Sequence, residues 1–153
     1  MGRMTVDCTG ANVFVAGGTS GINLGIAEGF AAAGARVAVM SRSQDKVDAA
    51  VRRIRDLGAE SIGAAADVRD VEATCAALTA AHEAFGDIDV LVSGAAGNFP
   101  ATALGMSPNA FRSVVEIDLL GTYHVLRTGY EFLRKPGAVV INISAPQKLA
   151  WTC

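Results

Sequence analysis

The stretch VFVAGGTSGINLGIAEGF, from Val13 to Phe30, decides the fold class. It opens with an apolar run, Val13 to Ala16, that ends at paired glycines. Apolar residues then recur at helical spacing between positions 21 and 33, in a row formed by Ile22, Ile26, Phe30 and Ala33. The stretch therefore predicts a buried strand, a glycine-rich turn and a helix, in that order.

The rest of the chain repeats this order. Short apolar runs predict four further strands, at 36–40, 61–65, 88–92 and 138–144. Helical periodicity fills the intervening segments, at 43–57, 70–85 and, in two helical parts, 107–135. Such alternation implies parallel strands joined by right-handed crossovers. We predict a doubly wound α/β fold, with a parallel sheet of about five strands and helices on both faces.

Length and composition point to one domain, residues 1–153, of which 51% is hydrophobic. The net charge is −2 and the basic residues are scattered, which argues against nucleic-acid binding. No apolar stretch approaches the roughly 20 residues that span a bilayer, and the first ten residues lack the apolar core of a signal peptide. We expect a cytoplasmic protein without a membrane partner. The three cysteines are far apart and predict neither a disulfide framework nor a metal site.

The turn after the first strand fits the pyrophosphate of a dinucleotide. Its glycines allow backbone conformations that a Cβ forbids, and amides at the start of the helix would face the phosphates. The predicted cofactor contacts here are Gly17, Thr19, Ser20, Gly21, Ile22 and Asn23. A tight turn without a ligand is the alternative.

Position 23 departs from the usual turn, Gly-x-x-x-Gly-x-Gly, because it holds Asn23. Gly21, Gly25 and Gly29 lie four residues apart, and we expect this stripe to keep the helix closely packed without a glycine at 23. The Asn23 amide would then contact the pyrophosphate or the ribose on the nicotinamide side. Ordinary polarity of a first helical turn is the competing interpretation.

The ends of the second and third strands select the dinucleotide. Ser41 and Arg42 stand where an NAD-binding protein would place an acidic residue against the ribose hydroxyls. The guanidinium fork of Arg42 suits a 2′-phosphate, so NADP(H) is predicted, with a solvated loop charge as the alternative. Asp67 is expected to accept from the adenine amino group while Val68 packs beside the ring; helix capping by Asp67 is the alternative.

In this order and spacing, the motifs from about Asn12 to Ala145 resemble the short-chain dehydrogenase/reductase family, whose fold is of the Rossmann type. The segment SGAAGNFP, Ser93 to Pro100, resembles the NCAAGNF segment of the 2,4-dienoyl-CoA reductase branch more than the usual Asn-Asn-Ala-Gly. The resemblance implies cofactor contacts at Ser93, Gly94, Ala95 and Ala96. It implies substrate contacts at Asn98 and Phe99.

Two further departures resemble the same branch. VVEIDLLGTYHV puts Asp118 where most family members have a catalytic asparagine, and INISAP puts Ala145 where most have a catalytic serine. The resemblance implies NADPH-dependent reduction of a dienoyl-CoA to an enoyl-CoA, with an acyl-CoA as the small-molecule substrate. Asp118 is the candidate catalytic residue, and would orient a water that delivers the proton.

The family's Tyr-x-x-x-Lys motif is absent from this sequence. Tyr123 with Arg127 and Tyr130 with Arg134 imitate its spacing, but we interpret them as ordinary helix residues. Relatives run to roughly 250 residues, and the final QKLAWTC loses the resemblance. We therefore expect an incomplete domain that lacks the C-terminal strands and the active-site helix, through a frameshift, a premature stop or a cloning artefact, with impaired activity.

Such a chain would leave its fifth strand as an exposed sheet edge. The segment from Ala110 to Leu133 resembles the one through which family members dimerise, so a homo-oligomer is expected. Two other functions stay open: a carbonyl or 3-oxoacyl reductase of the same family, and a non-catalytic dinucleotide-binding or oligomerising module.

Overall fold

The computed structural model describes residues 6–97, 101–102 and 104–144. Its centre is one parallel sheet in the order β3-β2-β1-β4-β5. The strands are β1 Asn12–Ala16, β2 Arg36–Ser41, β3 Ser61–Ala65, β4 Val90–Ser93 and β5 Val139–Asn142. The predicted doubly wound α/β fold is confirmed.

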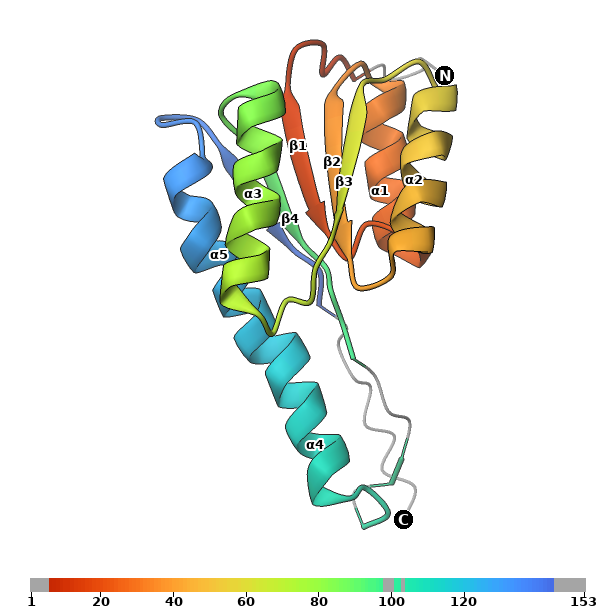
Figure 1. Ribbon diagram of the computed structural model, residues 1–153, viewed down its shortest axis with the longest axis vertical. Coiled ribbons are helices and arrows are strands. Elements are labelled where there is room, and N and C mark those ends of the chain that lie inside the picture. The colour runs from red at the N-terminus through yellow and green to blue at the C-terminus, as the bar shows by residue number, and fades with distance from the viewer. Residues whose placement is uncertain (1–5, 98–100, 103, 145–153) are drawn as a thin grey trace, which may run out of the picture.

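Helices cover both faces of this sheet. They are α1 Gly21–Ala32, α2 Gln44–Asp56, α3 Val71–Phe85, α4 Pro108–Val114 and α5 Gly121–Gly129. A π-helix, η1 Val115–Leu120, joins α4 to α5, and a 3₁₀ turn, η2 Tyr130–Phe132, follows α5. Figure 1 shows α1 and α2 on one face and α3 and α5 on the other, while α4 runs on past the edge of the sheet.

The core has two halves, one on each side of the sheet. Successive residues of a strand point to opposite faces, so Val13 and Val15 pack toward α1 and α2. Phe14, between them, packs toward the side of α3 and α5. Every residue of β1 is buried, which explains why the sequence reads as an unbroken apolar run there.

The α1 helix buries only part of the row that its sequence predicts, since Ile26 and Phe30 are partly buried against the core. Leu24, Ala27 and Ala31 are its buried residues, whereas Ile22 is 72% exposed. The glycine stripe does not mark close packing either, because a Cβ added at Gly25 would meet no heavy atom within 4 Å. The same holds for Gly21 and Gly29. Close packing through this stripe is therefore a wrong prediction.

The start of the fourth strand and the connection between the last two helices also differ from prediction. The fourth strand begins at Val90 rather than at position 88, and Ile88 forms only an isolated bridge with Leu133. The two predicted helical parts of 107–135 are joined through η1, where the backbone stays helical. As expected, β5 lies at the edge of the described sheet, with Val139 and Val140 partly exposed.

Candidate functional site

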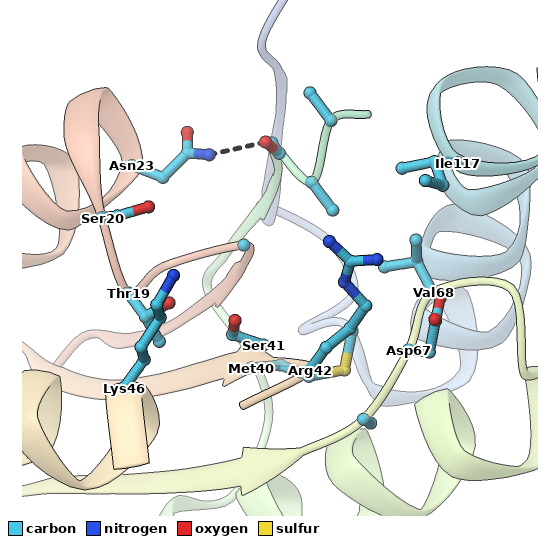
Figure 2. Close-up of a pocket in the computed structure, with 15 residues that line it drawn as sticks. Thr19, Ser20, Asn23, Met40, Ser41, Arg42, Lys46, Asp67, Val68 and Ile117 are labelled. Atoms are coloured by element: carbon cyan, nitrogen blue, oxygen red, sulfur yellow. Dashed lines mark hydrogen bonds between the residues drawn. The ribbon is translucent and has the colours of Figure 1, made fainter. Parts of the chain in front are cut away.

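A cleft of about 300 Å³ opens beyond the carboxyl ends of the strands (Figure 2). It lies where the strand order reverses, because β1 stands between β2 and β4. Ligands of doubly wound folds bind at this position. Residues from the end of β2, from the segments that follow the first four strands, and from the helices α1, α2 and η1, line it: Gly17, Thr19, Ser20, Asn23, Met40, Ser41, Arg42, Lys46, Ala66, Asp67, Val68, Gly94, Ala95, Ala96 and Ile117.

The glycine turn forms one wall of the cleft. Gly17 has a φ of +78°, which residues with side chains rarely adopt, and its amide donates to the Met40 carbonyl at 2.7 Å. A Cβ on Gly17 would lie 2.8 Å from the backbone nitrogen of Ala95, so the turn touches the loop after β4. Ser20 is the N-cap of α1 and its side chain makes no capping bond. Amides at the start of α1 thus keep donors that an anion can accept from.

Two cations, Arg42 and Lys46, also line the cleft, with Lys46 beside Thr19 of the glycine turn. Arg42 follows β2, and Lys46 stands in the first turn of α2, which the Ser43 hydroxyl caps by accepting from the Lys46 amide at 3.5 Å. Figure 2 shows both side chains extending into the cleft. Sequence reasoning missed Lys46. The available signal was its position four residues after Arg42, just beyond a helix cap at the same edge of the sheet.

Asp67 and Val68 lie at the third strand's end, as predicted. Asp67 forms an ion pair with Arg69 at 2.6 Å, and this bond from the Arg69 side chain lowers the pKa of Asp67. Asp70, not Asp67, caps α3 by accepting from the Ala73 amide at 2.9 Å. The capping alternative for Asp67 is therefore wrong.

The loop after β4, residues 94–97, closes the cleft between α1 and η1. The Gly94 amide donates to the Ala16 carbonyl at 3.1 Å. The Asn23 amide nitrogen donates to the Gly94 carbonyl at 2.6 Å, which Figure 2 shows as a dashed line. Asn23 thus bonds to protein backbone, a partner that sequence reasoning did not foresee.

Asp118 meets the other end of this loop. Its Oδ1 accepts from the Gly97 amide at 2.6 Å, and its side chain is exposed. The neighbouring Ile117 is buried and lines the cleft. Both residues belong to the π-helix η1, a rare element that often marks functional sites. The candidate catalytic residue therefore lies beside the cleft and holds its loop.

Some predicted site residues lie outside the cleft lining. Gly21 and Ile22 begin α1 but are not among the lining residues, and Ser93 is buried, with its hydroxyl 3.5 Å from that of Thr122. Asn98 and Phe99, the predicted substrate contacts, fall outside the described residues, as does Ala145. Ser144, one position before Ala145, is described and exposed.

The tyrosines that imitate the family motif lie elsewhere. Tyr123 is 59% exposed on α5, and Tyr130 is 56% exposed with the Lys135 ammonium over its ring. Arg134 is engaged in an ion pair with Asp89. Within the described ranges, no three acidic, histidine or cysteine side chains gather as a metal site. None of the helices in these ranges combines the length and the hydrophobicity that a membrane span requires.

Known proteins share this architecture. The L-sorbose reductase of Gluconobacter frateurii, solved with NADPH and L-sorbose, has a TM-score of 0.82 and 26% identity, over 91% of this chain and 54% of that one. An actinorhodin polyketide ketoreductase solved with NADPH has a TM-score of 0.84 and 28% identity, over 92% and 55%.

Sequence relatives are closer. A peroxisomal 2,4-dienoyl-CoA reductase of Arabidopsis thaliana is 39% identical over 145 residues, 89% of this chain and 49% of that protein. The Rattus norvegicus enzyme of the same name is 43% identical over 134 residues, 86% and 46% respectively. The chain thus spans about half the length of the curated relatives it matches. Residues 11–149 match the family described as short chain dehydrogenase. With that match and a glycine turn at the strand-order reversal, the chain belongs to the short-chain dehydrogenase family of oxidoreductases.

Proposed function

We propose that this chain is the dinucleotide-binding part of an NADPH-dependent 2,4-dienoyl-CoA reductase. The observation that carries the cofactor assignment is the placement of Arg42 and Lys46 together at the cleft that the glycine turn opens. The substrate class rests on the relatives named 2,4-dienoyl-CoA reductase at 39% and 43% identity. An acyl-CoA is accordingly the proposed substrate.

The cleft residues fit NADPH. Uncapped amides at the start of α1 suit the pyrophosphate. Arg42 offers a fork of donors and Lys46 a compact charge, which together suit the 2′-phosphate that distinguishes NADPH from NADH. Among the described residues that line the cleft, no carboxylate stands at the end of β2 to accept from free ribose hydroxyls. Asp67 and Val68 would border the adenine.

Bound NADPH would supply a hydride to the far end of the conjugated dienoyl system, and a proton would add nearer the thioester. Asp118 would act in the protonation step. Its carboxylate could orient the water that delivers the proton while its Oδ1 accepts from the Gly97 amide. A carboxylate alone is a poor donor, and Tyr-x-x-x-Lys is absent from this sequence. We expect the chain by itself to bind NADPH with little turnover.

Fluorescence titration with NADPH and NADH tests the cofactor assignment. NADPH should bind the 153-residue chain more tightly. In the double variant Arg42→Ala/Lys46→Ala, NADPH affinity should fall about 100-fold or more while NADH affinity changes little, since charge-assisted bonds contribute roughly 1.5–3 kcal/mol each. Arg52→Ala is the matched control, because Arg52 lies exposed on α2 outside the cleft lining. Equal loss for both cofactors would refute the 2′-phosphate assignment, and no binding at all would refute the dinucleotide site.

The second candidate is a non-catalytic dinucleotide-binding module, because the residues that line the cleft account for cofactor binding and Asp118 alone is the candidate for proton delivery. Assays of NADPH oxidation, one with a 2,4-dienoyl-CoA and one with a 3-oxoacyl-CoA, distinguish the dienoyl-CoA reductase, the carbonyl reductase and the binding module. Slow oxidation with the dienoyl substrate supports the reductase assignment. Preference for the 3-oxoacyl substrate would favour a carbonyl reductase, and firm NADPH binding with no oxidation would favour the binding module.

A further inference from the structure

Asn23 and Gly94 face each other across the junction of α1 and the loop after β4, although they lie 71 residues apart. The Asn23 Nδ2 donates to the Gly94 carbonyl at 2.6 Å. Both residues line the cleft. This contact is a direct bond between the helix that begins at the phosphate turn and the loop that forms the facing wall.

The Asn23 side chain fills the space that a side chain on Gly94 would need. A Cβ built on Gly94 would have three nearest heavy atoms, all from the Asn23 side chain, with Cγ and Nδ2 at 2.5 Å. Gly94 is not among the glycines with positive φ, so its backbone conformation is open to other residues. Gly17 differs, because its φ of +78° and its contact with Ala95 both require glycine. A side chain at position 94 would therefore displace the Asn23 amide from its present place.

The Asn23 amide can take only one useful orientation. Its Nδ2 must face the Gly94 carbonyl, since the opposite orientation would bring two oxygen acceptors together. The Oδ1 is buried and has no hydrogen-bond partner among the described residues. An asparagine that leaves its own acceptor unpaired loses part of the benefit of the bond. The contact is thus better explained by what it does to the loop than by stability alone.

The loop itself is short and tied at both ends. The Gly94 amide donates to Ala16 at 3.1 Å, and the Gly97 amide donates to Asp118 at 2.6 Å. Between these ties, Ala95 and Ala96 line the cleft. The Asn23 bond fixes the peptide that precedes these two alanines. It therefore sets how far this wall stands from the phosphate turn.

We propose that Asn23 is a positioning residue of the cofactor cleft and that Asn23 and Gly94 act as one unit. The usual turn has glycine at position 23, and the usual Asn-Asn-Ala-Gly segment has asparagine at the place of Gly94. This chain has the two residue types exchanged, so the side chain at this junction comes from position 23 and the glycine stands at position 94. The inference rests on the proposed dinucleotide site, toward which the loop is positioned.

A double-mutant cycle tests the unit: Asn23→Gly, Gly94→Ala and both together, each measured for NADPH affinity and for urea unfolding. Gly94→Ala alone should displace Asn23, weaken NADPH binding about 10-fold and lower the unfolding midpoint. The same change in the Asn23→Gly background should cost less than 2-fold further, because the space is then free. Asn23→Asp keeps the shape but replaces the donor by an acceptor, and should weaken NADPH at least as much as Asn23→Gly.

The two readouts separate the possible failures. Non-additive effects on both NADPH affinity and unfolding support the proposal. Non-additive unfolding with unchanged NADPH affinity in all folded variants would reduce the pair to packing and overturn the positioning role. Additive effects in both would overturn the unit itself. Wild-type chain that binds no NADPH would defeat the proposed function and the positioning role with it, while unfolding would still show whether the two residues are coupled.

Discussion

At the residue scale, the glycines of this chain have different physical reasons to be glycine. Gly17 combines a left-handed backbone with a close approach to Ala95. Gly18 lacks the unusual backbone, but its added Cβ would lie 2.9 Å from the Val15 carbonyl oxygen. Gly25 has neither constraint. A glycine-rich sequence therefore says little about which glycine the fold needs.

The contrast gives a stability prediction. Gly25→Ala should stabilise the chain by roughly 0.5–1 kcal/mol, because alanine restricts the unfolded chain and favours the helix interior. Gly18→Ala should destabilise it by about 1–3 kcal/mol through overpacking against β1. Urea unfolding of both variants measures the two free energies. Gly29→Ala serves as a second helix control, and destabilisation by Gly25→Ala would contradict the open surroundings of that site.

At the element scale, the ion pair between Asp89 and Arg134 connects the sheet to the segment after η2. Burial raises the pKa of Asp89, but bonds from the Arg134 side chain and the Asn12 amide outweigh it, so the pKa lies below its ordinary value of 3.8. The Asn12 amide bond to Asp89 measures 2.8 Å and the Arg134 contact is an ion pair. One carboxylate thus joins the start of β1, the start of β4 and the segment leading to β5.

This link predicts an acid-dependent stability. A folded pKa below the unfolded one stabilises the native state fully above about pH 3.8, and that stabilisation is lost as the pH falls through the folded value. Asp89→Asn should therefore lower the free energy of unfolding at pH 7 and flatten its fall on acidification below pH 4. Thermal or urea unfolding over a pH series provides the measurement.

The control for this series is Asp56→Asn, at the exposed end of α2. Its free energy of unfolding at pH 7 should not fall as it does in Asp89→Asn, because Asp56 lies exposed at the C-terminal end of a helix, where a negative charge is not stabilising. An Asp89→Asn curve parallel to the unaltered one below pH 4 would show that the carboxylate gives no net acid-linked stabilisation.

At the scale of the whole molecule, the helical rod from α4 to η2 carries apolar side chains on its surface. Those most exposed are Phe111, Leu119, Leu120, Tyr123 and Tyr130. α4 extends past the sheet, as Figure 1 shows, so the sheet does not cover it. Exposed apolar surface of this kind marks association sites. The predicted homo-oligomer would bury this rod.

Charge placed on the rod tests this association. Leu119→Glu combined with Tyr123→Glu should shift the chain toward the monomer by introducing unpaired charges into an apolar contact. Light scattering coupled to gel filtration measures the mass. Leu57→Glu is the control, since Leu57 is about half exposed on the opposite layer, after α2. A monomeric unaltered chain, or an equal shift in the control, would contradict an interface on the rod.

The sequence by itself determined the order of strands and helices and the edge of the sheet at which the site lies. Apolar runs, helical periodicity and caps are local patterns, and parallel strands bring their carboxyl ends to one edge whatever their exact register. Gly17, Arg42 and Asp67 could therefore be assigned to one cleft before any contact was known. Lys46 carried the same kind of local signal but was missed.

Only the tertiary structure decided which distant residues touch. The bond between Asn23 and Gly94, the reach of Asp118 to Gly97 through a π-helix, and the exposure of Ile22 all depend on how α1 and η1 sit against the sheet. Periodicity fixes the spacing of residues along a helix, but not the rotation of that helix on its neighbour. That rotation is set by packing of the whole core, so no local pattern contained it.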